Sequence, residues 1–189
     1  MTEYSELTQR LAALPRSARA VHGACCALRY VPVLTTIAPH LETAATESID
    51  LLVDHLGSVD EDRLATASDR VEALVPDVGD AQDPLYWVAD ALSLVSYALQ
   101  CARSDASPEP VNWACAGALN IASEIDVYVR KEGVPARLKQ LDIAAQESSI
   151  RQLQRDVAPS TVAHLRSEAA VVAAEVERLL PVFLPALRR

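Results

Sequence analysis

The alternation of apolar and polar positions predicts helices along almost the whole chain. The clearest case is the stretch from Asp83 to Arg103, where five apolar residues recur at steps of three and four, the spacing of one helical face. These residues are Leu85, Val88, Leu92, Val95 and Leu99, and a second apolar band of Trp87, Ala91, Leu94 and Ala98 lies roughly opposite. A helix that is apolar around most of its circumference is normally buried, so we expect this one to be the central helix.

Helix-start and helix-stop residues divide the rest of the chain. Asp83 is a suitable N-cap and Pro84 a suitable first helical residue. Further helices are expected over residues 3–14, 16–30, 43–56, 60–75, 109–132 and 135–157, with a short helical corner between Pro32 and Pro39 and a last helix capped by Ser160. The predicted fold class is therefore all-α, one domain over residues 1–189, a bundle of about seven to eight helices around a buried central helix.

The last helix carries a sharp apolar seam. Its members alternate at steps of three and four, and they are Val162, Leu165, Ala169, Val172, Val176 and Leu179. Such a seam packs either inside a domain or against a second copy of the chain. Internal packing is favoured by the apolar-stripe rule, and a homodimer through the C-terminal helix is the alternative.

The charge of the chain is unevenly placed. The net charge is −9, and between Glu42 and Glu109 fifteen acids face three bases. Binding to nucleic acid depends on a basic surface, which argues against a nucleic-acid partner. The acidic middle segment is suited to a basic protein partner, although a merely solvated acidic surface explains it equally well.

The location of the protein is predicted from its first residues and its hydropathy. The start MTEYSELTQR is polar and lacks the apolar region of a secretory signal, and no apolar run approaches the length of a membrane span. The four cysteines form no framework of the secreted type and are expected to be reduced thiols in the core. We expect a cytoplasmic protein with no membrane partner.

Motifs for catalysis and cofactors are weak. Five scattered glycines exclude a phosphate-binding loop of the Gly-rich kind. His22 with Cys25 and Cys26 could offer two metal ligands on one helical face, but packing is the favoured interpretation. Two further sets have helical spacing: Glu47, Asp50, Asp54 and His55, which resemble half of a di-iron site, and the pair His164 and Glu168. We predict no metal, no cofactor and no catalytic residue from these patterns.

One polar stripe remains as a candidate binding site. Tyr86, Asp90 and Tyr97 follow one flank of the expected central helix. Asn120, Glu124 and Tyr128 are spaced by four on the next helix, so an antiparallel pair would bring the six residues to a common pocket for a polar small ligand. The alternative is a buried hydrogen-bond network or an ordinary wet face.

Several short stretches together resemble the YjaG-like family of small helical bacterial proteins, a domain of unknown function. They are Arg29, Tyr30 and Pro32 at an early corner, the run from Ile49 to Val53, the stretch from Glu72 to Pro76, and Asp90 to Leu92. The sequence departs from the family at Val31 and in a shorter segment between Pro32 and Asp50. The resemblance implies a compact all-helical domain and carries no known reaction.

Two functions of different classes follow from these observations. The first is a non-enzymatic protein-interaction module, an adaptor or an immunity-type neutraliser, that presents its acidic middle segment to a basic partner. The alternative is a helical bundle that binds a small molecule, or acts on one, in the pocket of Tyr86, Asp90, Tyr97, Asn120, Glu124 and Tyr128. Whether the chain is an enzyme is left open by the sequence, which favours the first class.

Overall fold

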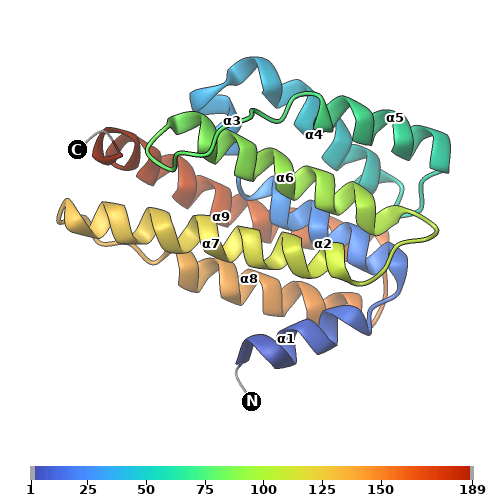
Figure 1. Ribbon diagram of the computed structural model, residues 1–189. Coiled ribbons are helices and arrows are strands. Elements are labelled where there is room, and N and C mark those ends of the chain that lie inside the picture. Colours follow the sequence, from blue (N-terminus) through green and yellow to red (C-terminus); the bar gives the residue numbers. More distant parts are fainter. Residues whose placement is uncertain (1–2, 188–189) are drawn as a thin grey trace.

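Helices account for all the regular structure in residues 3–187, the part of the chain that the computed structural model describes (Figure 1). In chain order they are α1 (Glu3–Ala12), α2 (Arg16–Leu28), α3 (Val31–Ile37), α4 (Pro39–Asp54), α5 (Glu61–Glu72), α6 (Pro84–Ala102), α7 (Glu109–Lys131), α8 (Leu138–Leu153) and α9 (Pro159–Ala186). The all-α prediction is confirmed. The short α3 is the expected helical corner, and the other eight are the expected longer helices.

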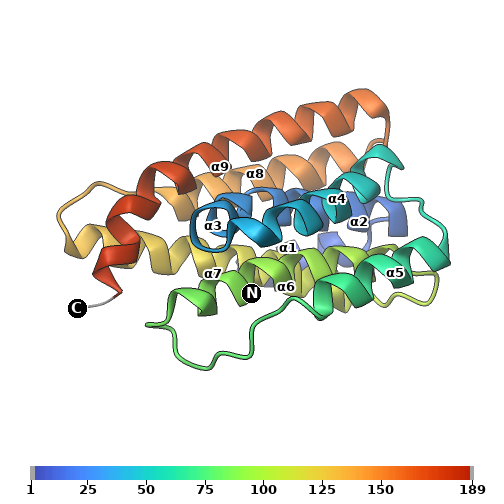
Figure 2. The same cartoon turned by 90° about the horizontal axis from the view of Figure 1, so that it is seen from above.

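Two helices share the centre of the bundle. α6 is buried as predicted and packs on α2, α3, α4, α5 and α7. α2 is buried even more continuously, because every residue from Ala20 to Ala27 is inaccessible to solvent. Seen from above, α2 lies between α8 and α9 on one side and α5 and α6 on the other (Figure 2).

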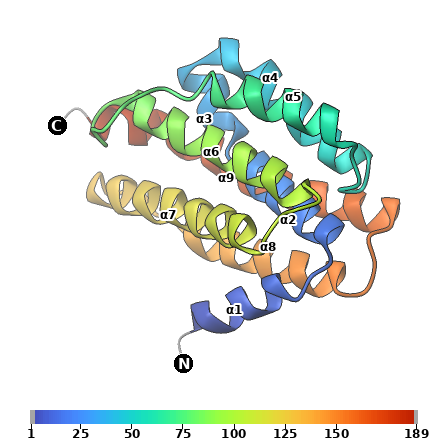
Figure 3. The ribbon, with the colours of Figure 1, turned by 45° about the vertical axis from the view of Figure 1, so that its right-hand side comes forward.

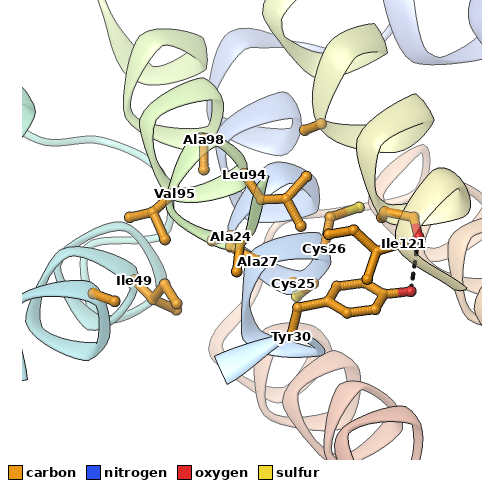
Figure 4. Packing of buried hydrophobic residues seen from close by; sticks show 14 of the residues in the cluster. Ala24, Cys25, Cys26, Ala27, Tyr30, Ile49, Leu94, Val95, Ala98 and Ile121 are labelled. Carbon is orange, nitrogen blue, oxygen red and sulfur yellow. Dashed lines mark hydrogen bonds between the residues drawn. The ribbon is translucent and has the colours of Figure 1, made fainter. Parts of the chain in front are cut away.

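Small residues let α2 and α6 approach closely. A methyl group added to Gly23 of α2 would lie 3.0 Å from the Cα atom of Ala98 on α6. Ala24 and Ala27 of α2 lie in the same core as Val95 and Ala98 of α6 (Figure 4). Close backbone approach of this kind depends on residues with little or no side chain.

The last helix runs the length of the bundle and continues past the expected seam. All six seam residues are buried within the chain: Val162, Leu165, Ala169, Val172, Val176 and Leu179. α9 then extends through Pro181 and Pro185 to Ala186. The extension has a packing reason, because the Phe183 ring lies edge-on to Trp87 and Tyr128 at centroid distances of 5.0 and 5.6 Å.

One stretch meets the length and composition of a membrane span. It covers Arg16–Ile37, and 67% of its most apolar window is buried inside the bundle. The stretch is made of α2 and α3, which separate at Arg29 and Tyr30. The core helices of water-soluble bundles pass the same test of length and composition, and this burial is typical of them.

The turn after α4 depends on a glycine that cannot be replaced without a clash. Gly57 has φ +71°, and a methyl group there would lie 2.2 Å from the carbonyl oxygen of Ser17. We expect Gly57→Ala to lower the free energy of unfolding by about 3 kcal/mol, because a left-handed conformation and a backbone clash add together. Urea denaturation followed by circular dichroism measures the loss.

The matched control is Gly133, which has φ +77° and open space around its Cα atom. Gly133→Ala should cost only about 1 kcal/mol, since the conformational penalty acts there alone. Equal losses at the two positions would show that the contact with Ser17 is not what constrains Gly57.

Candidate functional site

α6 and α7 are joined by a short loop and pack side by side (Figure 3). Residues of both helices line a hollow of about 410 Å³. We call this hollow the α6–α7 groove. It is lined from α6 by Tyr86, Asp90, Ser93, Leu94 and Tyr97, and from α7 by Trp113, Ala116, Gly117 and Asn120. Tyr97, late in α6, lies against Trp113, early in α7, and Tyr86, early in α6, is near Glu124 in the second half of α7. This is the antiparallel arrangement that the sequence analysis required.

The structure brings together four of the six residues singled out in the sequence. Tyr86, Asp90, Tyr97 and Asn120 line the groove. Glu124 lies one turn beyond Asn120, near enough to Tyr86 for its charge to raise the pKa of that phenol. Tyr128 lies elsewhere: its ring packs on Phe183, and the ammonium group of Lys131 lies 5.0 Å from the ring centroid.

Two small residues of α7, Ala116 and Gly117, line the groove. Gly117 packs closely on α6, because a methyl group added to it would lie 2.9 Å from Cδ2 of Leu94. A larger side chain at Gly117 would therefore displace Leu94, another residue that lines the groove.

Trp113 also lines the groove, and the sequence analysis did not single it out as a site residue. Its side chain is 48% exposed, and its ring lies 5.6 Å from the Tyr97 ring, tilted by 57°. One signal could have found it: Trp113 precedes Asn120 and Glu124 by seven and eleven residues, which places the three on one helical face. The groove therefore combines aromatic rings from both helices.

The groove is acidic, and its charge is not balanced by a nearby base among the described residues. Partial burial raises the pKa of Asp90 to about 6. The charge of Asp90, followed by burial and by Glu124, raises the pKa of Tyr86. Within the described residues, neither carboxylate forms an ion pair with a base of the chain. The arrangement is suited to a cation from outside, which the carboxylates attract and aromatic faces stabilise.

A second polar assembly lies deep in the core, and sequence reasoning missed it. We call it the buried polar network, and its members are His22, Arg29, Cys115, Asp142, Gln146 and Ser149. An Arg29 guanidinium N–H donates to Asp142 at 2.9 Å, and the Gln146 amide donates to the other Asp142 oxygen at 2.6 Å. The same amide group contacts the carbonyl and the thiol of Cys115. The network joins α2 and its C-cap residue to α7 and α8 by polar contacts inside the apolar core.

The possible metal ligands of α2 belong to this region. His22 Nδ1 lies 3.0 Å from the Ser149 hydroxyl, and His22 Nε2 lies 3.6 Å from Cys26 Sγ. Burial raises the pKa of the Cys26 thiol well above its usual range, although the Arg29 charge opposes the shift. In residues 3–187 no three His, Cys, Asp or Glu side chains are grouped to hold a metal ion. A protonated thiol beside a guanidinium is a poor ligand for a cation, so the geometry favours packing.

The other charged sets form pairs at the surface. Glu47 pairs with Arg70, Asp50 and Asp54 pair with Arg166, and Glu168 is contacted by His164 and by the Ser148 hydroxyl. His55 Nε2 lies 3.1 Å from a guanidinium nitrogen of Arg63. The carboxylates that resembled half of a di-iron site are therefore spread over contacts with α5 and α9 and do not converge on one point.

Much of the acidity of the middle segment is engaged within the chain. Five of its acids pair with arginines, and Asp60, Asp80 and Asp83 accept from backbone N–H groups. Among the described residues, the acids of this segment whose side chains have no such partner include Asp62, Asp69, Glu72 and Asp90. Asp69 and Glu72 line a hollow that also contains Gln100, and Gln100 continues the polar flank of α6 beyond Tyr97.

Comparison with known proteins adds a likeness of fold. No protein-family model matches the chain, and no curated protein sequence matches it either. The structure is similar to that of a DUF416 family protein from Shewanella baltica OS155, with a TM-score of 0.67 and 13% sequence identity over 87% of this chain and 93% of that one. At this identity the likeness shows the fold alone. It supports the coarser part of the resemblance, a compact all-helical fold, and does not reach the YjaG-like family specifically.

Proposed function

We propose that this protein is a non-enzymatic interaction module that binds a basic protein partner, whose cationic side chain enters the α6–α7 groove. The observation that carries the proposal is a hollow that combines Asp90 with the half-exposed ring of Trp113 and the partly buried rings of Tyr86 and Tyr97. Glu124 lies one turn beyond the hollow, and no base among the described residues forms an ion pair with either carboxylate. An acid that is partly withdrawn from water and left unpaired costs stability, which is typical of a functional position.

Charge complementarity extends along the same face of the protein. The polar flank of α6 runs from Tyr86 to Gln100, and at Gln100 a second hollow begins. In that hollow Arg103 pairs with Asp105, and the acids Asp69 and Glu72 form no ion pair among the described residues. A basic segment lying along α6 could therefore place one cation in the groove and others beside α5.

We place this module in the cytoplasm. A homodimer through α9 would use the outer face of that helix, where Val171 is 62% exposed.

The volume of the groove favours a second candidate, a free small amine. About 410 Å³ is within the range of small-molecule sites, and Tyr86, Ser93 and Asn120 could orient a polar ligand. Both candidates use the same cation chemistry. A basic protein partner would also contact the acids of α5, whereas a free amine would use the groove alone.

The test titrates a short fluorescent peptide rich in lysine and arginine against the protein and follows its anisotropy. We expect the double variant Asp90→Asn/Glu124→Gln to weaken binding by about ten-fold, because it removes both carboxylates at the groove. The matched control is Glu42→Gln/Asp62→Asn, which removes the same charge from exposed positions outside the groove. Equal losses in the two variants would mean that general attraction, and not the groove, binds the peptide.

Two structural points guide the choice of variants. Asp60 accepts a hydrogen bond from the backbone N–H of Arg63 and caps α5, so reversing its charge would damage the helix as well as the acidic surface. Asp90→Asn should fold at least as well as the parent at neutral pH, because partial burial penalises the ionised carboxylate. A thermal melt confirms that any loss of binding is not a loss of structure.

A further inference from the structure

We propose that the α6–α7 groove selects an arginine side chain of the partner over a lysine side chain. The inference rests on the proposed function and names the group that the groove recognises. It follows from three properties of the groove: aromatic side chains from both helices, a carboxylate partly removed from water, and no base among the residues that line it.

The aromatic walls come from both sides of the groove. Tyr86 and Tyr97 stand on α6, and Trp113 stands on α7 with half of its surface exposed. The rings of Tyr97 and Trp113 are tilted by 57°, so they are not stacked on each other and a ring face is left for another partner. A guanidinium group stacks on aromatic faces, and the compact ammonium of lysine does so less effectively.

Asp90 lies between the two tyrosines along the groove-lining flank of α6. It lies four residues after Tyr86 and seven before Tyr97, on the same helical flank. An ammonium ion is strongly hydrated and loses that water on entering a partly buried site, whereas a guanidinium is weakly hydrated and forms two parallel hydrogen bonds to a carboxylate. The position of Asp90 therefore favours guanidinium on grounds of hydration and of geometry.

The described part of the chain supplies no competing cation at this position. Arg103, at the end of α6, pairs with Asp105, and Lys131 lies over the ring of Tyr128. Lys139 lines a separate hollow on the other side of α7, which shares Ala116 and Asn120 with the groove. The groove is thus free to accept a guanidinium from a partner.

The two tryptophans provide a direct measurement. Trp113 lines the groove, whereas Trp87 is buried and its indole N–H donates to the carbonyl of Ala81 at 3.0 Å. In a ¹⁵N-labelled sample the two indole N–H signals report on the groove and on the core respectively. The probes are two short glycine- and serine-rich peptides that differ only in one central residue, arginine or lysine, with N-acetylarginine amide as a third probe.

We expect the arginine peptide to shift the Trp113 indole signal, leave that of Trp87 in place, and bind about five-fold or more tightly than the lysine peptide. Asp90→Asn should abolish this difference. Equal affinity of the two peptides would overturn the selectivity and leave the proposed function standing. No shift of Trp113 with either peptide would overturn the proposed function as well. N-acetylarginine amide binding as tightly as the peptide would overturn the assignment to a protein partner in favour of a small guanidino compound.

Discussion

Replacing Asp142 with alanine should lower the free energy of unfolding by about 3–5 kcal/mol. Asp142 and Arg29 are both fully buried, and a guanidinium N–H of Arg29 donates to the carboxylate at 2.9 Å. Burial by itself would lower the pKa of Arg29, but the carboxylate more than offsets this effect, so the arginine stays charged. Removing the carboxylate would leave that charge in the apolar core without a partner. Urea denaturation of Asp142→Ala measures the loss.

Two control variants separate the effect of burying a charge from the effect of pairing it with an opposite charge. Glu47→Ala breaks an ion pair with Arg70 in which both side chains are about half exposed, and it should cost less than about 1 kcal/mol. The double variant Arg29→Met/Asp142→Leu removes both charges and should recover most of the loss, because apolar groups can replace a buried ion pair. A double variant no more stable than Asp142→Ala would show that the pair itself, and not the orphaned charge, supplies the stability.

Acidification should destabilise the protein through His22. Burial, followed by the charge of Arg29, lowers the pKa of His22 to about 3 from an ordinary value of 6.5. Between these values the unfolded chain binds a proton that the folded protein does not. The contribution of neutral His22 to the free energy of unfolding is therefore complete above pH 6.5. It falls by up to about 1.4 kcal/mol for each pH unit below that value, so that about 4–5 kcal/mol is lost near pH 3.

His22→Gln tests this expectation, because glutamine has no proton to gain and its amide can still contact Ser149. The variant should show a shallower fall of the unfolding free energy between pH 6.5 and 3, whatever its stability at pH 7. His40→Gln, at an exposed position, should keep the parent slope. The raised pKa of Asp90 acts in the opposite direction between about pH 6 and 3.8, and its partial exposure makes that effect smaller. An unchanged slope in His22→Gln would contradict the assignment.

The helices could be predicted where periodicity and a strong start residue agree. Asp83 caps α6 by accepting from the N–H of Leu85, as expected. Two other expected starts are wrong for one physical reason. α4 begins at Pro39 and α9 at Pro159, earlier than the expected caps Thr43 and Ser160, because proline at the first helical position needs no N–H partner and has its φ angle already set. Pro39 was interpreted as the end of the short helical corner, and it is also the first residue of α4.

The groove and the buried polar network differ in how well the sequence indicates them. The flank of Tyr86, Asp90 and Tyr97 has a regular spacing within one helix, so its shared face was predictable. Asp142, Gln146 and Ser149 look like an ordinary polar flank of α8, and Arg29 comes from α2 at a separation of 113 residues. Only the packing of α8 against α2 places them in the core. The signal in the sequence is that these polar residues share a stripe with the buried Leu138 and Leu153.

The position of α2 at the centre has a consequence for synthesis of the protein. This helix leaves the ribosome before α6, α7, α8 and α9, on which it packs, and Arg29 meets its carboxylate only after another 113 residues have been added. At ordinary elongation rates that interval is roughly 6–23 seconds. During this interval the core is incomplete. It cannot yet bury the apolar face of α2 or the adjacent thiols of Cys25 and Cys26. A nascent chain of this protein is therefore most exposed to thiol oxidation and to chaperones at α2, a helix that is almost wholly buried in the folded state.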